Sequence, residues 1–491
     1  MLAAALLLSA CQPPGSPSGW AAVGAARPAG ATDTTEPGTT EPNTIEPVTT
    51  GATSTTTTEP GVADSTTTSA PTGSTVPPGD VPVEATGTAV PADTSVTATV
   101  GAADVSAAAA CPSPTNLTAP DHFVSGWVPY WGTDPSRAAI QQHATDVGDV
   151  SPLFYGANND GTVSLLGPQS QLNLTVTATR NAGLPLIVGV FDSTGAGVMS
   201  GILADPASRT GHVNSLVDLA VSKGYDGIDL DYEVFAFSHP RSEWGDIKTN
   251  WVAFVNELSA ALHAQGKVLS VTVPPVWNGG NSGYWVYGQA EIANAVDRLR
   301  LMVYDYNVAS PGPISPMYWV CDVIAYSSSV VPASKLQLGV PAYGRHWVTR
   351  TNVNETCPDG ALYKESVLMK NIASAAAGHV LTRHSGGELT ASWTQTVTGP
   401  RTKPLPAPVY PPANYTIPEV TGPAAGGQLQ PAMRLSPGSI QVTCTVLHTI
   451  FVPDAYTVDQ HADAAQAAGW RGIILWATGY ESADLFTVLR S

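Results

Sequence analysis

Short apolar runs rich in β-forming residues alternate with segments of helical periodicity from about His122 to the C-terminus. The apolar runs that we interpret as strands cover residues 123–130, 153–155, 184–191, 227–233, 268–273, 299–304, 336–342 and 472–476. Strands that alternate with helices are typical of parallel α/β proteins, in which the helices cover the sheet. Eight such strands is the number in a TIM (β/α)8 barrel, and this α/β barrel is the fold that we expect.

Two of the intervening helices carry recognisable start or stop signals. Asp205 followed by Pro206 supplies an N-cap and a first-turn proline, and Gly224 predicts the end of the same helix. Thr457 to Gln460 fits a capping box that opens the helix before the last strand. These signals support the alternation of strands and helices that the apolar pattern predicts.

One connection is too long for a barrel loop. About 130 residues separate the last two predicted strands, where a helix and two short loops would suffice. We therefore expect a small α+β insertion between strands seven and eight, at about residues 348–444. Cys357 and Cys444 stand at its two ends, which favours a disulfide that closes its stem.

The chain has five cysteines, and no two of them form a CxxC pair, which argues against a zinc site. Cys11 stands apart near the N-terminus. The others, Cys111, Cys321, Cys357 and Cys444, can form two disulfides in an oxidising compartment. By count alone, the sequence leaves all three connectivities open.

The N-terminal part of the chain differs from the rest in composition. Residues 12–118 are mainly Thr, Ser, Pro, Ala and Gly, so we expect a long disordered tether before an ordered domain at 119–491. The apolar run 2–8 and Cys11 resemble a bacterial lipobox in a signal segment at 1–11. We expect Cys11 to be lipidated and to hold the protein on the outer face of the cytoplasmic membrane, at the cell surface or in the cell wall. An ordinary signal peptide of a secreted, extracellular protein is the alternative.

The charge of the chain excludes one class of partner. The formal net charge is −18, and 12% of the residues are charged. Nucleic acids are bound through clusters of Lys and Arg, and no run of basic residues occurs here, so no nucleic-acid partner is expected. We expect the protein to be a monomer.

Three carboxylates line one side of the predicted strand at 227–233. Side chains alternate along a strand, so Asp229, Asp231 and Glu233 share one face, and Ile228 and Leu230 share the other. In a barrel the acidic face points inward and places Glu233 at the C-terminal mouth, where active sites form. Repulsion should leave at least one carboxyl protonated, as a general acid requires. A chance acidic strand on a solvated edge and a divalent metal site are the alternatives.

The same strand carries a family resemblance. Residues 226–233, DGIDLDYE, resemble the DGxDxDxE signature of glycoside hydrolase family 18, the chitinase-like enzymes. Matching motifs follow in order: 302–305 resemble M-x-Y-D, 339–345 resemble GxPxYGR, and Trp476 resembles the tryptophan on strand eight. The resemblance extends from about Phe123 to the C-terminus and implies a TIM barrel.

The resemblance implies a mechanism in which the substrate takes part. The acetamido oxygen of the −1 sugar attacks its own anomeric carbon, while Glu233 protonates the leaving oxygen and later activates water. Asp231 would hold the acetamido N–H, and Asp229 would share a proton with Asp231. No metal or organic cofactor is implied. The implied substrate contacts are Met302, Tyr304, Asp305, Tyr343, Arg345 and Trp476, to which we add Trp131 and the aromatic loop 277–287.

Two departures from the family pattern bear on the substrate. Residues 189–192 read GVFD, without the SxGG segment common in chitinases, and Val234 and Phe235 follow Glu233 where an aromatic–proline pair is usual. The chain therefore resembles the spore and cell-wall glycosidases of the family, which act on peptidoglycan or related N-acetylglucosamine polymers. We expect hydrolysis of β-1,4 bonds in peptidoglycan ahead of chitin. A lectin on the same barrel is the alternative, although such lectins typically replace the glutamate, and a structural wall protein is a third interpretation.

Overall fold

The computed structural model describes residues 122–402 and 439–490, together with Cys111. The expected lipidation site, Cys11, and all of the expected tether except Cys111 lie outside the described residues. No helix in the described part combines the length and the apolar character that crossing a bilayer requires.

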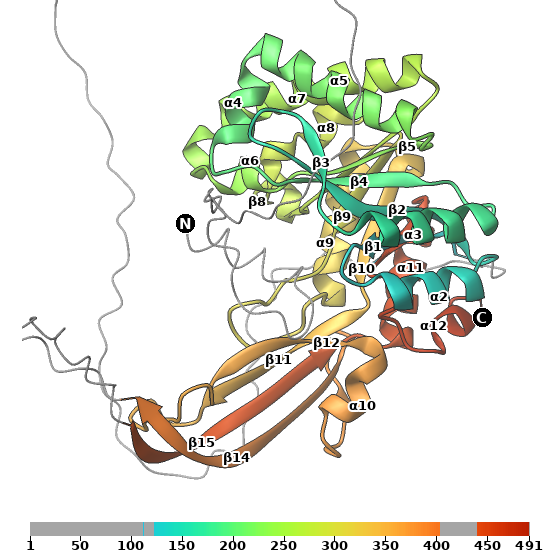
Figure 1. Ribbon diagram of the computed structural model, residues 1–491. Helices are drawn as coiled ribbons and strands as arrows, with labels where there is room; N and C mark the ends of the chain where they lie inside the picture. Colours follow the sequence, from blue (N-terminus) through green and yellow to red (C-terminus); the bar gives the residue numbers. More distant parts are fainter. Residues whose placement is uncertain (1–110, 112–121, 403–438, 491) are drawn as a thin grey trace, which may run out of the picture. The chain divides into compact units, whose positions relative to one another are not determined.

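Eight parallel strands form a closed barrel, which confirms the predicted TIM fold (Figure 1). They are β1 (Val124–Pro129), β2 (Val147–Ala157), β4 (Ile187–Asp192), β5 (Gly227–Asp231), β6 (Val268–Val273), β9 (Arg298–Met302), β10 (Leu336–Pro341) and β16 (Gly472–Trp476). Strand β1 pairs with both β2 and β16, and these two pairings close the ring. Three short strands lie in loops: β3 (Val163–Leu165), which pairs with β2, and the pair β7 (Val276–Trp277) and β8 (Ser282–Gly283).

Helices surround the strands and bury their outward apolar side chains. They are α2 (Thr133–Gln142), α3 (Gln169–Asn181), α4 (Val198–Ala204), α5 (Pro206–Ser222), α6 (Val234–Phe237), α7 (Trp244–Ala264), α8 (Gln289–Ile292), α9 (Met317–Val330), α11 (Ala455–Ala467) and α12 (Leu485–Val488). On α7, Phe254, Leu258 and Leu262 are fully buried, and so are Ile228 and Leu230 on β5. The apolar face of the carboxylate strand is therefore part of the core, as the alternation predicts.

The predicted N-cap is confirmed at α5, whereas α11 begins at a different residue from the one that the sequence predicts. Asp205 caps α5 by accepting a hydrogen bond from Ser208 N at 2.8 Å, as expected. The predicted capping box from Thr457 to Gln460 is wrong, because α11 begins earlier and its N-cap is Asp454, whose side chain accepts from Thr457 N. An aspartate one turn before the expected start is the better cap, since its carboxylate is charged and lies near the positive end of the helix dipole.

The described residues of the insertion before the last barrel strand form an antiparallel sheet and the short α-helix α10. Its elements are β11 (Tyr343–Arg350), β12 (Tyr363–Leu368), α10 (Ile372–Ala375), β13 (Thr382–Arg383), β14 (Leu389–Thr402) and β15 (Ser439–Val452), and the strand order is β12-β11-β15-β14-β13. The sheet extends beyond the expected bounds 348–444, because β11 starts almost directly after β10 and β15 continues past Cys444 to Val452.

Two disulfides select one of the three possible connectivities. Cys357 pairs with Cys444, with the Cα atoms 5.1 Å apart, which confirms the favoured bond at the stem of the insertion. Cys111 pairs with Cys321 on α9. The second bond ties the segment before the barrel to a helix far along the chain.

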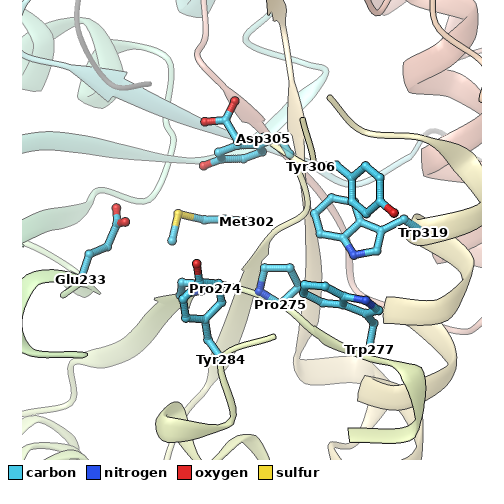
Figure 2. A pocket seen from close by; sticks show the side chains of 10 residues that line it. Glu233, Pro274, Pro275, Trp277, Tyr284, Met302, Asp305, Tyr306 and Trp319 are labelled. Atoms are coloured by element: carbon cyan, nitrogen blue, oxygen red, sulfur yellow. The ribbon is translucent and has the colours of Figure 1, made fainter. Parts of the chain in front are cut away.

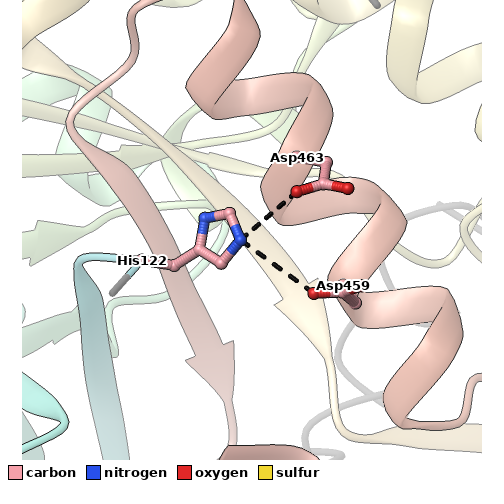
Figure 3. A group of neighbouring side chains, drawn as sticks. All are labelled: His122, Asp459 and Asp463. Carbon is pink, nitrogen blue, oxygen red and sulfur yellow. Dashed lines mark ion pairs between the residues drawn. The ribbon is translucent and has the colours of Figure 1, made fainter. Parts of the chain in front are cut away.

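A histidine beside two aspartates also joins the start of the barrel to α11. The Nε2 atom of His122 lies 3.3 Å from Asp463 Oδ1 and 3.9 Å from Asp459 Oδ1 (Figure 3). The two aspartates are one helical turn apart and face the same imidazole. His122 therefore anchors the chain to α11 immediately before β1 begins.

Candidate active site

The acidic face of β5 points into the barrel and leads to the C-terminal mouth. Asp229 and Asp231 are buried on the strand, and half-buried Glu233 follows at its end. Gly227 begins the strand, and a Cβ there would lie 2.3 Å from the carbonyl oxygen of Val268 on β6. Only glycine allows this close approach of backbones, which explains the glycine that precedes the three carboxylates.

Asp229 is surrounded by hydrogen-bond donors. It accepts from Trp127 Nε1 at 2.9 Å and from Thr272 Oγ1 at 3.1 Å, and it forms a buried ion pair with Arg300 at 2.6 Å. Both oxygens of Asp229 are thus engaged, Oδ2 by Trp127 and Arg300 and Oδ1 by Thr272. The donors also occupy the oxygens that a metal would need, so this set does not suit the divalent metal site kept as an alternative above.

Asp231 lies next along the strand in a different environment. Burial raises the pKa of Asp231 well above its ordinary value, and the charges of Glu233 and Asp229 raise it further. Its Oδ1 atom has no hydrogen-bond partner among the described residues. The resemblance implies that Asp229 and Asp231 share a proton. The raised pKa of Asp231 favours its protonated form.

Glu233 has the properties of a general acid near neutral pH. Burial raises the pKa of Glu233 to about 7, and the charges of Asp305 and Asp192 add to the effect. Asp192, at the end of β4, accepts from Phe235 N at 2.8 Å and from Thr194 Oγ1 at 2.7 Å, and burial raises its pKa to about 6. We did not predict Asp192 as a site residue. The sequence signal that could have identified Asp192 is its position at the end of an apolar strand, where the active-site residues of a barrel lie.

A pocket of about 220 Å³ opens beside Glu233. It is lined by Glu233, Pro274, Pro275, Trp277, Tyr284, Met302, Tyr304, Asp305, Tyr306 and Trp319. Figure 2 shows Glu233 at one end, the aromatic side chains of Trp277 and Trp319 at the other, and Met302 between them. The pocket therefore brings together Glu233, Met302, Tyr304 and Asp305 from the predicted set.

Tyr343 and Arg345 are placed beside the pocket through Asp305. Tyr343 Oη donates to Asp305 Oδ1 at 2.8 Å, and Arg345 donates to the same oxygen from Nε at 3.0 Å and from Nη2 at 2.6 Å. Asp305 has a φ of 62°, a strained conformation for a residue with a side chain. Arg345 is buried and does not line the pocket, and its hydrogen bonds hold Asp305 in place.

The predicted tryptophans form a separate aromatic group. Trp476 lies edge-on to Trp127, with ring centroids 5.8 Å apart, and to Trp131, with centroids 6.3 Å apart. Trp476 is buried, and neither it nor Trp131 lines the pocket. Their contact with a substrate stays a prediction.

Aromatic residues of two loops and of α9 form one wall of the pocket, which the sequence only partly predicts. Trp277 packs edge-on against Trp319 with centroids 5.6 Å apart, and Tyr306 lies 5.1 Å from Trp319. Trp277 and Tyr284 belong to the predicted aromatic loop 277–287. Tyr306 and Trp319 were not predicted, because their positions carry no motif and their proximity arises only from folding.

Known proteins show what this arrangement resembles. The model of the family described as Glycosyl hydrolases family 18 matches residues 127–481. The chain is 24% identical over 238 residues to a putative sporulation-specific glycosylase, YdhD, of Bacillus subtilis, covering 46% of this chain and 54% of that protein. It is 29% identical over 223 residues to Chitinase A1 of Niallia circulans, covering 40% of this chain and 31% of that protein. The alignments thus span about half or less of these relatives.

Solved structures share the fold. The chain superposes on a chitinase from Chromobacterium violaceum with a TM-score of 0.56 and 22% identity, covering 75% of this chain and 98% of that chain. It superposes on the spore cortex-lytic enzyme SleL of Bacillus megaterium with a TM-score of 0.56 and 16% identity, covering 77% of this chain and 75% of that chain. At these identities the superpositions establish the barrel architecture.

Proposed function

The chain belongs to family 18 of the glycosyl hydrolases, and we propose that this glycoside hydrolase cleaves β-1,4 bonds in N-acetylglucosamine-containing glycans with Glu233 as general acid and base. One observation carries the proposal: the Glu233 carboxyl lines an aromatic pocket and has a pKa raised to about 7. A carboxyl of this kind holds a proton near neutral pH and can also act as a base once it has lost that proton.

The proposed mechanism retains the anomeric configuration and uses the substrate as nucleophile. The acetamido oxygen of the −1 sugar attacks the anomeric carbon, and Glu233 gives its proton to the leaving glycosidic oxygen. The Glu233 carboxylate then takes a proton from water, and the resulting hydroxide oxygen opens the oxazolinium ring. Asp231 would contact the acetamido group, since its Oδ1 atom is buried without a partner among the described residues.

The remaining groups position and shield the reaction. Asp305, held by Tyr343 and Arg345, would contact the acetamido group and neighbouring hydroxyls. The apolar faces of Trp277 and Trp319 suit the C–H faces of further sugar rings. No step of this scheme needs a metal or an organic cofactor.

We propose peptidoglycan as the substrate ahead of chitin. Two observations support this order: the sequence departs from the chitinase pattern at 189–192 and 234–235, and the relatives include a sporulation-specific glycosylase and a cortical fragment-lytic enzyme, both of Bacillus subtilis. Relatives named as chitinases keep chitin as the second substrate. A lipid at Cys11 would bring a monomeric enzyme to the wall of its own cell, and labelling with a fatty acid that marks wild type but not Cys11→Ser tests that anchor.

One experiment tests the activity and the substrate together. The purified protein and its Glu233→Gln variant are incubated with purified peptidoglycan and, separately, with chitooligosaccharides, and the products are identified by mass spectrometry. Muropeptides released by wild type alone, with slow cutting of the oligosaccharides, would support the proposal. Rapid release of chitobiose without muropeptides would transfer the function to chitin. Equal turnover by both proteins would remove Glu233 from the mechanism.

A further inference from the structure

The insertion contacts the segment between β9 and α9, which carries the pocket residues Tyr304, Asp305 and Tyr306. The turn between β13 and β14 lies against the start of α9, where Met317 N donates to the carbonyl of Gly386 at 2.9 Å. The next residue but one, Glu388, is fully buried. A fully buried carboxylate is costly unless donors surround it, so the groups that meet Glu388 explain its presence.

Glu388 binds two consecutive backbone amides with its two oxygens. Ile314 N donates to Oε2 at 3.0 Å, and Ser315 N donates to Oε1. Burial raises the pKa of Glu388 to about 7, while the bonds from Ser315 and Ile314 lower it. Hydrogen bonds from neutral amides to a carboxylate are stronger than bonds between neutral groups. The insertion thus holds residues 314–315 of the barrel through the two oxygens of one carboxyl side chain.

Residues 314–315 are bonded in turn to the wall of the pocket. Tyr306 N donates to the carbonyl of Ile314 at 2.8 Å, and the Ser315 hydroxyl donates to the carbonyl of Val303 at 2.5 Å. Val303 directly precedes Tyr304 and Asp305, and the Tyr306 ring lies against Trp319 in the aromatic wall. A change at Glu388 would therefore move backbone atoms that set the position of Tyr306.

We propose that Glu388 is a positioning residue of the insertion, which holds residues 314–315 and thereby orients the Tyr306 wall for binding of the glycan. This inference rests on the proposed function, because it assigns the wall to the glycan. Glu388 lines no part of the pocket and acts only through the backbone of 314–315. A wall held in one place before binding loses less freedom when a sugar packs on it.

The test compares Glu388→Gln with Glu365→Gln. The first variant keeps the shape of the side chain but presents an amide nitrogen to one of the two backbone N–H groups. Glu365 lies on β12 of the same insertion, pairs with His346 and has a side chain that is 53% exposed, so it is a matched control. Kinetics with a chitooligosaccharide or a soluble peptidoglycan fragment, and hydrogen exchange of the segment containing Ile314 and Ser315, are measured for both variants.

For Glu388→Gln we expect KM to rise roughly 10-fold, since one of the two hydrogen bonds to the backbone of 314–315 is lost, while kcat stays within about 2-fold. Amide exchange at Ile314 and Ser315 should accelerate, and Glu365→Gln should match wild type in both measurements. A KM equal to that of the control, or a fall in kcat at constant KM, would overturn the positioning role. If Glu388→Gln does not fold, Ser315→Ala serves as the second variant, because it removes only the hydrogen bond to Val303. An unchanged KM in Ser315→Ala would likewise overturn the positioning role.

The same measurements separate this proposal from the proposed function. If wild type neither binds nor cuts either glycan, the proposed function fails, and the positioning of the wall for a glycan fails with it. If wild type cuts a glycan but Glu388→Gln leaves both KM and amide exchange unchanged, the function stands and only the role of Glu388 is lost.

Discussion

Replacing Arg300 with Met should destabilise the barrel more than the loss of any surface ion pair. Arg300 is fully buried and donates to Asp229 Oδ2 at 2.6 Å, to Asp149 Oδ1 at 2.8 Å and to Gln337 Oε1 at 3.1 Å. Methionine fills part of the space but carries no charge. Asp149 keeps a second cation, Arg298, at 2.6 Å. Asp229 loses its only ion-pair partner within the described chain.

The expected cost follows from this geometry. Removing one partner of a buried ion pair leaves an unpaired charge and typically costs about 3–5 kcal/mol. We expect about 3 kcal/mol for Arg300→Met, the lower end of that range, since Asp149 remains paired with Arg298 and Asp229 keeps its hydrogen bonds from Trp127 and Thr272. The ion pair of Arg209 with Glu257 is partly exposed, with side chains 17% and 30% accessible, and Arg209→Met should cost about 0–1 kcal/mol.

Urea unfolding followed by tryptophan fluorescence measures both losses. In the Arg300→Met background, a second substitution, Asp229→Asn, removes the unpaired charge and should restore at least about 1 kcal/mol. A loss of stability in Arg300→Met no larger than in Arg209→Met, or a further loss on adding Asp229→Asn, would contradict a stabilising buried ion pair.

Three further predictions concern the proposed catalytic carboxyl and the start of the domain. Glu233→Gln should lower kcat at least about 10²-fold, because the amide keeps the shape but cannot transfer a proton, whereas Glu243→Gln, at an exposed carboxylate, should keep the wild-type rate. Because the pKa of Glu233 is raised to about 7, its acid form is present below that pH and lost above it. On the alkaline side kcat should therefore fall about tenfold per pH unit, and a flat pH profile there would contradict the role of Glu233 as the acid. A chain that begins at Thr118 lacks Cys111 and its disulfide to α9. Its free energy of unfolding in urea should be about 2–4 kcal/mol lower than that of a chain that begins at Val105. Coincident urea midpoints would show that the disulfide contributes nothing to stability.

Much of the candidate site is visible in the sequence because it lies on regular strands. The alternation on β5 places Asp229, Asp231 and Glu233 on one face, and the structure puts the first two inside the barrel and the third at its mouth. Local spacing suffices for these three, since a strand has a fixed period and a barrel strand has one inward face. Met302, Tyr304 and Asp305 were expected instead from the resemblance of residues 302–305 to the M-x-Y-D motif, and all three line the pocket.

The state of these carboxyls depends on residues that are remote in the sequence. Arg300 lies on β9, yet it pairs with Asp229 on β5, and no local pattern predicts that pairing. Asp192 and Asp305 come from β4 and the end of β9, and together with burial they raise the pKa of Glu233. An ionisation equilibrium depends on distances and desolvation, which exist only once the chain is folded.

The sequence by itself determined the barrel, the inward acidic strand and the presence of an insertion, because apolar periodicity and chain length report burial and connection directly. The tertiary structure decided which cysteines pair, that Asp454 caps α11, and that Trp319, Tyr306 and Trp277 meet in one wall. It also decided that the insertion places Glu388 under the pocket segment. These contacts join elements that are far apart in the chain, and only the closing of the barrel brings them within bonding distance.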